Sequence, residues 1–311
     1  MPSTVPRGDE GGGSLSPTVT STELNLPLFA KGKVRDTYEL PDDRLLMVAT
    51  DRISAFDWVL PTGIRSRGAV LTQLSVFWFE KTRGLLPNHL ITGDMSGLPD
   101  SVRGDLEWLR LRSMIVKKAQ RIDFECVVRG YLAGSAWAEY KQQGTMAGEP
   151  LPAGMQQSQK LTEPLFTPAT KAESGHDENV TYQYVANAIG EDLASQLRDA
   201  SVRLYTFGAD YAEQRGLLLA DTKFEFGLLD GKLILIDEAL TPDSSRYWDA
   251  ATYRPGTSPD SYDKQPIRDW LAGSGWDKNS TPPPLPDEVV EESRQRYLKA
   301  YELLTGQPLP E

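Results

Sequence analysis

The sequence predicts a mixed fold of antiparallel strands and α-helices in about two domains. Three patterns carry this prediction: short strand-like segments within 34–129, a one-faced helical pattern over 193–211, and a strand–turn–strand pattern over 217–240. Of the 311 residues, 39% are hydrophobic. This fraction is enough to build a core and excludes a wholly disordered chain.

The N-terminal part begins with residues 1–24, which are rich in Ser, Thr, Pro and Gly and predict a flexible tail. After the tail, the segment 70–81 has the spacing of a helix. Strands are expected over 34–40, 45–50, 113–118 and 124–129, with turn residues at 41–43. This order of elements predicts an antiparallel sheet with one or two helices.

The middle of the chain predicts a long helix and a hairpin. Apolar residues recur at spacings of three and four from Leu193 to Tyr211, and Gly216 ends the pattern. Asp230 and Gly231 form a strong signal for a two-residue hairpin turn, so we expect paired strands within 217–240.

The C-terminal part combines an irregular region with a final helix. Residues 254–286 are rich in Pro, Gly and Ser, and we expect them to be extended on the surface. The apolar spacing after residue 290 predicts an amphipathic helix with Asp287 as its N-cap and Gly306 as its stop.

Charge and composition disfavour several classes of function. The chain has 33 Lys and Arg against 44 Asp and Glu, a net charge of −11, which disfavours binding along a nucleic-acid backbone. With one cysteine, Cys126, and two histidines, an intrachain disulfide is impossible and a His/Cys zinc site is almost excluded. No apolar run reaches the ~20 residues of a membrane helix, and the N-terminus lacks a secretory signal. We expect a cytoplasmic protein that binds neither nucleic acid nor membrane.

Three common motifs are absent. The sequence has no G-x-x-x-x-G-K-[ST] loop, no G-x-G-x-x-G after a strand and no G-x-S-x-G. Their absence disfavours a P-loop NTPase, a dinucleotide-binding fold and the common hydrolase elbow. If the protein binds phosphate, it uses a binding motif other than these three.

Two N-terminal segments could bind a ligand. In the segment 31–36 (KGKVRD), Gly32 permits a close backbone approach, while Lys33 and Arg35 could face the same way and hold a polyphosphate. A charged hairpin edge that resists aggregation explains the same residues. In 50–57 (TDRISAFD), adjacent Asp and Arg suit either a structural ion pair or a polar binding loop. Both alternatives stay open for each segment.

The segment 125–137 (ECVVRGYLAGSAW) predicts a strand, a turn and a helix. Arg129, the Ser135 hydroxyl and the first N–H groups of that helix would form an anion site. Alternatively, Ser135 is an ordinary N-cap. The segment 167–179 (TPATKAESGHDEN) is a dense polar loop that either binds a ligand or is solvated, and its His176 is either a general base or a structural histidine.

The predicted hairpin carries four carboxylates and a lysine on strands that otherwise look buried. Carboxylate oxygens suit Mg²⁺, which also takes phosphate oxygens from a nucleotide. A salt-bridge network around the lysine is the alternative. The residues are Asp221, Lys223, Glu225, Asp237 and Glu238.

An ideal two-residue turn pairs Glu225 with Ile236 and places Glu238, not Asp237, on the face of Glu225. If Glu225 and Asp237 share one metal, the hairpin needs a register shift such as a bulge at Gly231. In the loop that follows, 241–248 (TPDSSRYW), two hydroxyls and an Arg could bind a phosphate monoester, or could form a plain Asx or Ser turn.

Taken together, the six segments resemble the SAICAR synthetase family, the phosphoribosylaminoimidazole-succinocarboxamide synthases of purine biosynthesis. The motifs occur in the family's order over about residues 25–270: GKVRD, ATDRISAFD, ECVVRGYLAGSAW, ATKAESGHDEN, LADTKFEFG and IDEALTPDSSRYW. Each motif is modest alone, but six in order are highly specific.

The resemblance implies an α+β fold and an ATP-dependent ligase. It implies a small N-terminal antiparallel-sheet domain, similar to a kinase N-lobe, at 25–117 and a larger ATP-grasp-like domain at 118–270, with ATP in the cleft between them. A C-terminal extension follows at 271–311. The expected reaction joins L-aspartate to the carboxylate of carboxyaminoimidazole ribonucleotide (CAIR), gives SAICAR, ADP and phosphate through an acyl phosphate, and uses ATP and Mg²⁺.

The resemblance also implies roles for particular residues. Catalytic roles fall to Lys33, Asp177 and Lys223, and Mg²⁺ ligation falls to Glu225 and Asp237. Contacts with ATP are expected from Lys31, Gly32, Lys33, Val34, Arg35, Lys117, Lys118, Lys223, Glu225 and Asp237. Contacts with substrate are expected from Asp57, Glu125, Arg129, Ser135, Lys171, Asp177, Asp221, Ser244 and Arg246, of which Arg129, Ser135, Ser244 and Arg246 hold the 5′-phosphate.

Two other functions stay open. A kinase for a small metabolite would use the same nucleotide and metal, although the sequence lacks its H-R-D-x-x-x-x-N loop. A non-catalytic nucleotide sensor would bind ATP without chemistry. The expected partners are small-molecule substrates, and the expected assembly is a monomer or a small homo-oligomer.

Overall fold

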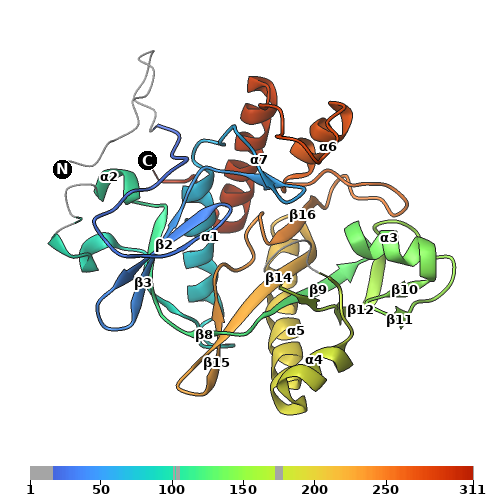
Figure 1. Cartoon of the computed structure of the whole chain (residues 1–311). Helices are drawn as coiled ribbons and strands as arrows, with labels where there is room; N and C mark the ends of the chain where they lie inside the picture. Colours follow the sequence, from blue (N-terminus) through green and yellow to red (C-terminus); the bar gives the residue numbers. More distant parts are fainter. Residues whose placement is uncertain (1–16, 101, 103–105, 172–177, 311) are drawn as a thin grey trace. The chain divides into compact units, whose positions relative to one another are not determined.

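The computed structural model describes residues 17–100, 102, 106–171 and 178–310. The chain divides into two compact units, and Figure 1 labels most of their helices and many of their strands. The first unit contains residues 1–77, 89–118 and 264–311, and the second contains residues 78–88 and 119–263. Both ends of the chain therefore contribute to the first unit.

The first unit contains a five-stranded antiparallel sheet, as the sequence predicts. Its order is β1 (Leu28–Lys31), β2 (Arg35–Leu40), β3 (Arg44–Ala49), β7 (Ser113–Lys117) and β6 (Leu90–Thr92). All four neighbouring pairs are antiparallel. Asp42 and Asp43 adopt positive φ in the turn between β2 and β3, a conformation that Asp tolerates better than most residues.

Short elements and helices complete the first unit. They are the strands β4 (Ser54–Ala55) and β5 (Trp58–Val59), the 3₁₀ turn η1 (Met95–Gly97), α1 (Arg67–Thr82, which enters the second unit at Trp78), α2 (Leu106–Leu109), α6 (Gln265–Gly273) and α7 (Asp287–Thr305). Tyr38, Leu46, Val48 and Ile115 from the sheet pack with Leu98 and Leu109 in its core. The predicted helix over 70–81 is therefore confirmed as α1.

The predicted flexible tail, 1–24, falls largely on residues outside the described part. Of the residues that are described, Val19 is buried and its N–H donates to Asp51 Oδ2 at 2.8 Å. Thr22 is also buried and donates to Asp36 Oδ2 at 2.7 Å. These contacts hold residues 19–22 on the first unit, because two buried carboxylates need donors that the sheet alone does not supply.

The C-terminal region differs from the sequence prediction in two places. Helix α6 lies within 254–286, which we expected to be extended. Its Pro266 stands in the first turn, where the missing N–H breaks no hydrogen bond, and Ile267 and Leu271 are buried on one face. Helix α7 ends at Gly306 as predicted, but its N-cap is Pro286, and Asp287 is its first helical residue.

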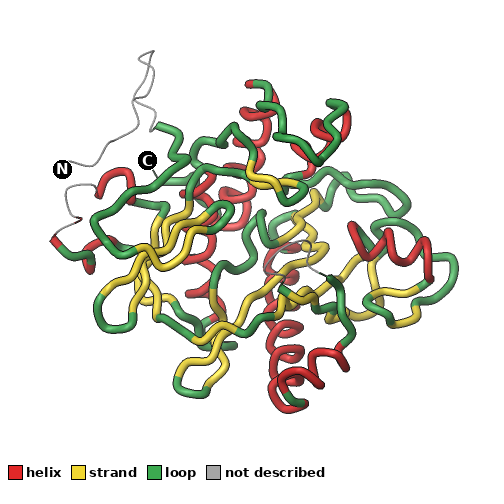
Figure 2. Tube along the Cα trace, in the orientation of Figure 1, coloured by secondary structure: helices red, strands yellow, loops and turns green. Residues whose placement is uncertain are grey.

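The second unit is built on a seven-stranded sheet. Its main path is β12 (Lys160–Phe166), β9 (Phe124–Tyr131), β14 (Leu217–Leu229) and β15 (Lys232–Ile236); β13 (Ala169–Thr170) pairs with β9, and β8 (Gln120–Arg121) and β16 (Ser245–Asp249) pair with β14. Figure 2 shows these strands in yellow. The predicted hairpin is confirmed: Leu229 pairs with Lys232, and Asp230 and Gly231 both have positive φ, as a type I′ turn requires.

Helices and a small hairpin surround this sheet. The helices are α3 (Gly134–Gln143), α4 (Tyr182–Ile189) and α5 (Glu191–Glu213), and the hairpin is β10 (Thr145–Met146) with β11 (Glu149–Pro150). The long helix predicted from the apolar spacing is confirmed as α5, which packs on β9 and β14 and buries Leu197, Ala200 and Leu204.

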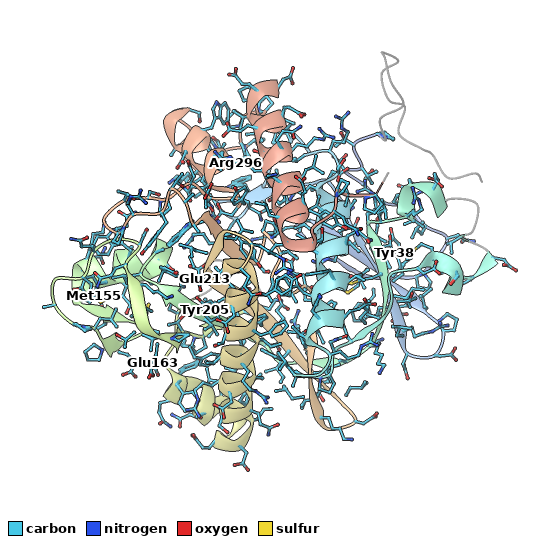
Figure 3. All side chains as sticks on the ribbon, turned by 180° about the vertical axis from the view of Figure 1, so that it is seen from behind. Tyr38, Met155, Glu163, Tyr205, Glu213 and Arg296 are labelled. Atoms are coloured by element: carbon cyan, nitrogen blue, oxygen red, sulfur yellow. The ribbon has the colours of Figure 1, made fainter. Side chains whose placement is uncertain are left out.

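Tyr205 fixes the packing distance between α5 and the sheet. This side chain is labelled in Figure 3, and its hydroxyl donates to the Leu219 carbonyl oxygen at 2.7 Å. A Cβ on Gly130 would lie 1.9 Å from that hydroxyl oxygen. The glycine in the Arg129-Gly130 pair is therefore required for close packing next to a candidate binding residue.

We expect Gly130→Ala to lower the free energy of unfolding by about 1–3 kcal/mol, because the added methyl group overlaps the Tyr205 hydroxyl. Denaturant unfolding measures the change. Gly84→Ala is the matched control, since a Cβ there has no atom within 4 Å. Tyr205→Phe removes the overlapping oxygen, so the double variant should lose less stability than the sum of the single variants. Strict additivity would contradict this account of the packing.

Candidate active site

Two adjacent strands of the second unit, β9 and β14, carry five of the predicted site residues. In the register of β9 and β14, Asp221 pairs with Arg129 and Lys223 pairs with Val127. Alternation along a strand puts Glu125 and Arg129 on one face of β9 and puts Asp221, Lys223 and Glu225 on one face of β14. The sheet therefore gathers charged side chains in two neighbouring rows.

Asp221 lies between two arginines. Its Oδ2 accepts a hydrogen bond from Arg246 Nη1 at 2.7 Å and lies 3.4 Å from Arg129 Nη1. On its other side, Arg246 has its Nε 3.8 Å from Asp263 Oδ2. All four side chains are at most one-fifth exposed. Buried charges need such partners, because desolvation of an unpaired charge is costly.

Two hydroxyl groups accept hydrogen bonds from the Nε and Nη2 atoms of Arg129. Its Nε donates to Thr167 Oγ1 at 3.0 Å, and its Nη2 donates to Ser135 Oγ at 3.1 Å. Burial lowers the pKa of the Arg129 guanidinium and Arg246 adds to this effect, while Asp221 opposes it. An anion placed beside the two arginines would relieve their mutual repulsion.

The beginning of α3 lies against these arginines. Gly134, the first residue of the helix, has a φ of 58°, and a Cβ there would lie 2.7 Å from Arg246 Nη2. The N-cap is Ala133 and makes no side-chain capping bond, so the interpretation of Ser135 as an ordinary N-cap is wrong. Helix N-termini and paired arginines both favour anions.

The loop after β15 forms a Ser/Thr turn. The Thr241 N–H donates to Ser244 Oγ at 3.2 Å, and the Ser244 N–H donates to Thr241 Oγ1 at 3.3 Å. The Lys223 N–H donates to the Ser244 carbonyl oxygen at 2.8 Å, which ties the turn to β14. The structure thus contains the plain turn of the sequence analysis, and two residues further on β16 carries Arg246.

Two lysines neutralise the acids of the hairpin and of β9. Lys223 forms an ion pair with Glu125, and Lys171, which follows β13, forms an ion pair with Glu225. Burial acts to lower the pKa of Lys223, but Glu125, Glu225 and Asp237 outweigh it and raise that pKa. Lys223 therefore stays protonated near neutral pH and acts as a fixed positive charge.

The hairpin register answers the geometric question about Asp237. Glu225 pairs with Ile236 and the ladder is regular down to the turn, so no bulge is present at Gly231. Instead, β15 ends at Ile236 and Asp237 adopts a φ of 66°. The alternation of side chains along β15 therefore does not extend to Asp237.

In the first unit, the structure brings two of the predicted site residues into direct contact. Lys33 Nζ lies 2.8 Å from Asp57 Oδ1, and about half of each side chain is exposed. Lys118 Nζ pairs with Glu39 Oε1 at 3.1 Å and lies 4.7 Å from the centre of the Phe29 ring. Lys31 and Lys117 end β1 and β7 and are exposed.

Gly32, Val34 and Arg35 complete this set. The Gly32 N–H donates to the Arg35 carbonyl oxygen at 2.7 Å, which closes the tight turn between β1 and β2. The carbonyl oxygen of Val34 accepts from Thr50. Asp177 and His176 lie outside the described residues, so the predictions for them stay predictions.

The sequence analysis did not predict the site contacts of three residues: Thr167, Asp263 and Arg52. Thr167 stands in a polar segment that was noticed, but nothing local marks it as the partner of Arg129. Asp263 lies in the Pro/Gly/Ser-rich region that was expected only to cover the surface. Arg52 has its nearest partners far from it in sequence, at the turn between β1 and β2.

Among the described residues, none of the helices combines the length and the apolar composition needed to cross a bilayer. Within the same residues, no group of three or more His, Cys, Asp or Glu is arranged to hold a metal ion. Paired arginines beside a helix N-terminus are typical of sites that bind phosphate or carboxylate groups.

The comparisons identify the family. The model of the SAICAR synthetase family matches residues 28–283, and the chain belongs to this family. The phosphoribosylaminoimidazole-succinocarboxamide synthase of Syntrophobacter fumaroxidans is 52% identical over 285 residues, covering 91% of this chain and 94% of the relative. That of Elusimicrobium minutum is 49% identical over 284 residues, covering 91% of this chain and 97% of the relative.

Solved structures agree with this result. The SAICAR synthase from Saccharomyces cerevisiae in complex with SAICAR has a TM-score of 0.85 and 43% identity, covering 94% of this chain and all of that one. A SAICAR synthetase in complex with ADP has a TM-score of 0.65 and 26% identity, covering 91% of this chain and 99% of that one. The resemblance inferred from six motifs and the predicted α+β fold are both confirmed.

We expect Asp221→Asn to lower the free energy of unfolding by about 3–5 kcal/mol, because it leaves Arg129 and Arg246 buried without their shared counter-charge. Inorganic phosphate should therefore raise the melting temperature of the variant more than that of the unaltered protein. Thermal unfolding with phosphate, and with chloride at equal ionic strength, measures both effects. If phosphate stabilised neither protein more than chloride does, the result would contradict an anion site at these arginines.

Proposed function

We propose that the protein is an ATP-dependent ligase that joins L-aspartate to the carboxylate of CAIR and releases SAICAR, ADP and phosphate, a step of purine biosynthesis. The observation that carries the proposal is the set of Arg129, Arg246 and Ser135 at the start of α3, in a chain of the SAICAR synthetase family. A ribonucleotide needs a site of this chemistry for its 5′-phosphate.

In this proposal, the arginine pair and the Ser244 turn hold the 5′-phosphate of CAIR. Arg129 and Arg246 provide guanidinium N–H groups, and Ser135 and Ser244 provide hydroxyl groups. Asp221 keeps both arginines in place and, with Glu125, contacts the ribose or the aminoimidazole. The SAICAR complex of the yeast relative supports this assignment of the substrate class.

The proposed nucleotide site uses the turn between β1 and β2. Lys31, Gly32, Lys33, Val34 and Arg35 contact the ATP phosphates. Lys117 and Lys118 lie by the adenine, while Asp57 and Lys171 contact substrate. The ADP complex of a solved family member supports the use of ATP.

The residues present fit Mg²⁺. Glu225 and Asp237 supply carboxylate oxygens, which Mg²⁺ prefers, and two carboxylates suffice because the ion completes its shell with water and substrate phosphates. We therefore assign Mg²⁺ to Glu225 and Asp237. When bound, it neutralises charge on the phosphates during transfer.

The proposed chemistry has two steps. An oxygen of the CAIR carboxylate attacks the γ-phosphorus of ATP, and the bond to the bridging oxygen breaks, which releases ADP. The aspartate amine then attacks the acyl phosphate, phosphate leaves, and the nitrogen gives up a proton. Lys223 stays protonated and stabilises the transferring charge. The family resemblance gives Lys33 a catalytic role as well. The family resemblance places Asp177 beside the reacting carboxylate.

The remaining parts of the proposal concern location and partners. A single, buried cysteine suits a reducing compartment, so we place the enzyme in the cytoplasm. Its proposed partners are its small-molecule substrates, and it is a monomer or a small homo-oligomer.

We expect ADP release that requires both L-aspartate and CAIR, measured with a coupled assay while each substrate is left out in turn. Arg246→Ala should raise KM for CAIR by about tenfold or more, because a hydrogen bond to a charged phosphate is lost, and should change KM for ATP little. ADP release without aspartate would overturn the ligase proposal. An equal rise in both KM values would show that the arginine assignment is wrong.

We expect Glu225→Gln and Asp237→Asn each to raise the Mg²⁺ concentration for half-maximal activity by about tenfold. Calorimetric titration of Mg²⁺ into the ADP-bound protein gives a second readout that is independent of turnover. Glu238→Gln is the matched control, since an unbroken strand would have put Glu238 on the Glu225 face. A larger effect of Glu238→Gln than of Asp237→Asn would contradict the assignment of Asp237.

A further inference from the structure

The turn between β1 and β2 is held from one side by Arg52. Its Nη2 donates to the Gly32 carbonyl oxygen at 3.0 Å, and its Nε donates to the Lys33 carbonyl oxygen at 3.0 Å. The next carbonyl oxygen, of Val34, accepts from the Thr50 N–H at 3.0 Å and from Thr50 Oγ1 at 2.7 Å. Three successive carbonyl groups of the turn are therefore engaged by the segment that follows β3.

Arg52 is itself fixed by a buried carboxylate. Asp36 is 1% exposed, and its Oδ1 and Oδ2 lie 2.7 Å and 3.2 Å from Arg52 Nη2 and Nη1. Arg52 Nη1 also donates to the Thr20 carbonyl oxygen at 3.1 Å. With Asp36 neutralising its charge and five hydrogen bonds in total, the Arg52 guanidinium has little freedom to move.

The hydrogen bonds from Arg52 also determine where the neighbouring N–H groups of the turn point. No cis peptide bond is present in the described residues, and in a trans peptide the N–H points opposite to the C=O. Because Arg52 takes the carbonyl groups of Gly32 and Lys33, the N–H groups of Lys33 and Val34 point away from it. Among the described residues, neither of these N–H groups donates to a backbone carbonyl oxygen.

Two successive N–H groups that point outward from a turn form a concave site for an anion. The Gly32 and Lys33 positions are exposed, so a ligand can reach this site. The Lys33 ammonium comes from the same turn and adds a positive charge. Two outward N–H groups and an ammonium group suit the negatively charged oxygens of a polyphosphate better than they suit an uncharged ligand.

We propose that Arg52 is the positioning residue of the nucleotide polyphosphate: it orients the Lys33 and Val34 N–H groups toward the phosphates without touching them. This inference rests on the proposed function, because it assumes that ATP is the nucleotide. It gives Arg52 a positioning role for the ligand, whereas the sequence alone favoured a structural ion pair for this segment.

The test compares ATP with adenosine, which lacks phosphates, by calorimetric titration of the full chain in the presence of Mg²⁺. Arg52→Lys keeps the charge but cannot hold two carbonyl groups and Asp36 together. It should weaken ATP binding about tenfold, the equivalent of one hydrogen bond to a charged group, and leave adenosine within about twofold. Arg44→Lys is the matched control, because Arg44 Nε holds the Pro41 carbonyl oxygen of a different turn in the same sheet.

A second pair of variants leaves Arg52 intact. Lys33→Pro removes both the ammonium group and the backbone N–H of residue 33, whereas Lys33→Ala removes only the ammonium group. The proline variant should therefore bind ATP about tenfold more weakly than the alanine variant. If Lys33→Pro and Lys33→Ala bind ATP equally well, the inference is overturned. It is also overturned if Arg52→Lys leaves the ratio of ATP affinity to adenosine affinity unchanged. Equal weakening of both ligands by Arg52→Lys would show a purely structural role. No ATP binding by the unaltered protein would overturn the proposed function itself.

Discussion

The charged site of the second unit depends on one buried carboxylate. Asp221 lies between Arg129 and Arg246, and without it two guanidinium groups would be buried side by side. Like charges in such surroundings repel strongly, because little water remains to screen them. The carboxylate therefore lets the protein fold with a cationic site already formed, and it leaves the remaining N–H groups of both arginines oriented before a ligand arrives.

Two glycines allow the elements that form this site to pack closely together. Gly130 brings the strand that carries Arg129 close to α5, because Tyr205 occupies the space of any side chain there. Gly134 brings the start of α3 against Arg246 in the same way and supplies a positive φ. The two glycines of the segment 125–137 therefore help to position Arg129 and Arg246. This explains why glycines and a charged residue occur together in the motif.

Much of the fold could be predicted from local patterns. The Asp230-Gly231 pair fixed the hairpin register because a two-residue turn leaves no freedom in the pairing, and the spacing from Leu193 to Tyr211 marked α5. Helix α6 was missed because the Pro, Gly and Ser content of 254–286 indicated irregular structure, although its Pro266 stands in the first turn of the helix, where proline is well tolerated.

The partners of the site residues could not be predicted in the same way. Motifs revealed which residues carry charge, but pairings such as Arg246 with Asp263 or Arg129 with Thr167 form between strands and loops. Asp237 shows a related limit: the sequence analysis assumed that strand alternation continues to this residue, whereas β15 ends at Ile236 and Asp237 has a positive φ.

The two units hold their charges in place by different physical means. In the second unit, the side chains themselves are locked, because Arg129, Arg246, Lys223 and Lys171 each have a carboxylate partner in surroundings where a lost partner is costly. In the first unit, the Lys33–Asp57 pair is half-exposed, and exposed pairs contribute little to stability. Rigidity there has to come from the backbone, which Arg52 and Thr50 hold through three successive carbonyl groups. A lysine on a fixed turn can change partners, from Asp57 to a phosphate, without any movement of the sheet that carries it.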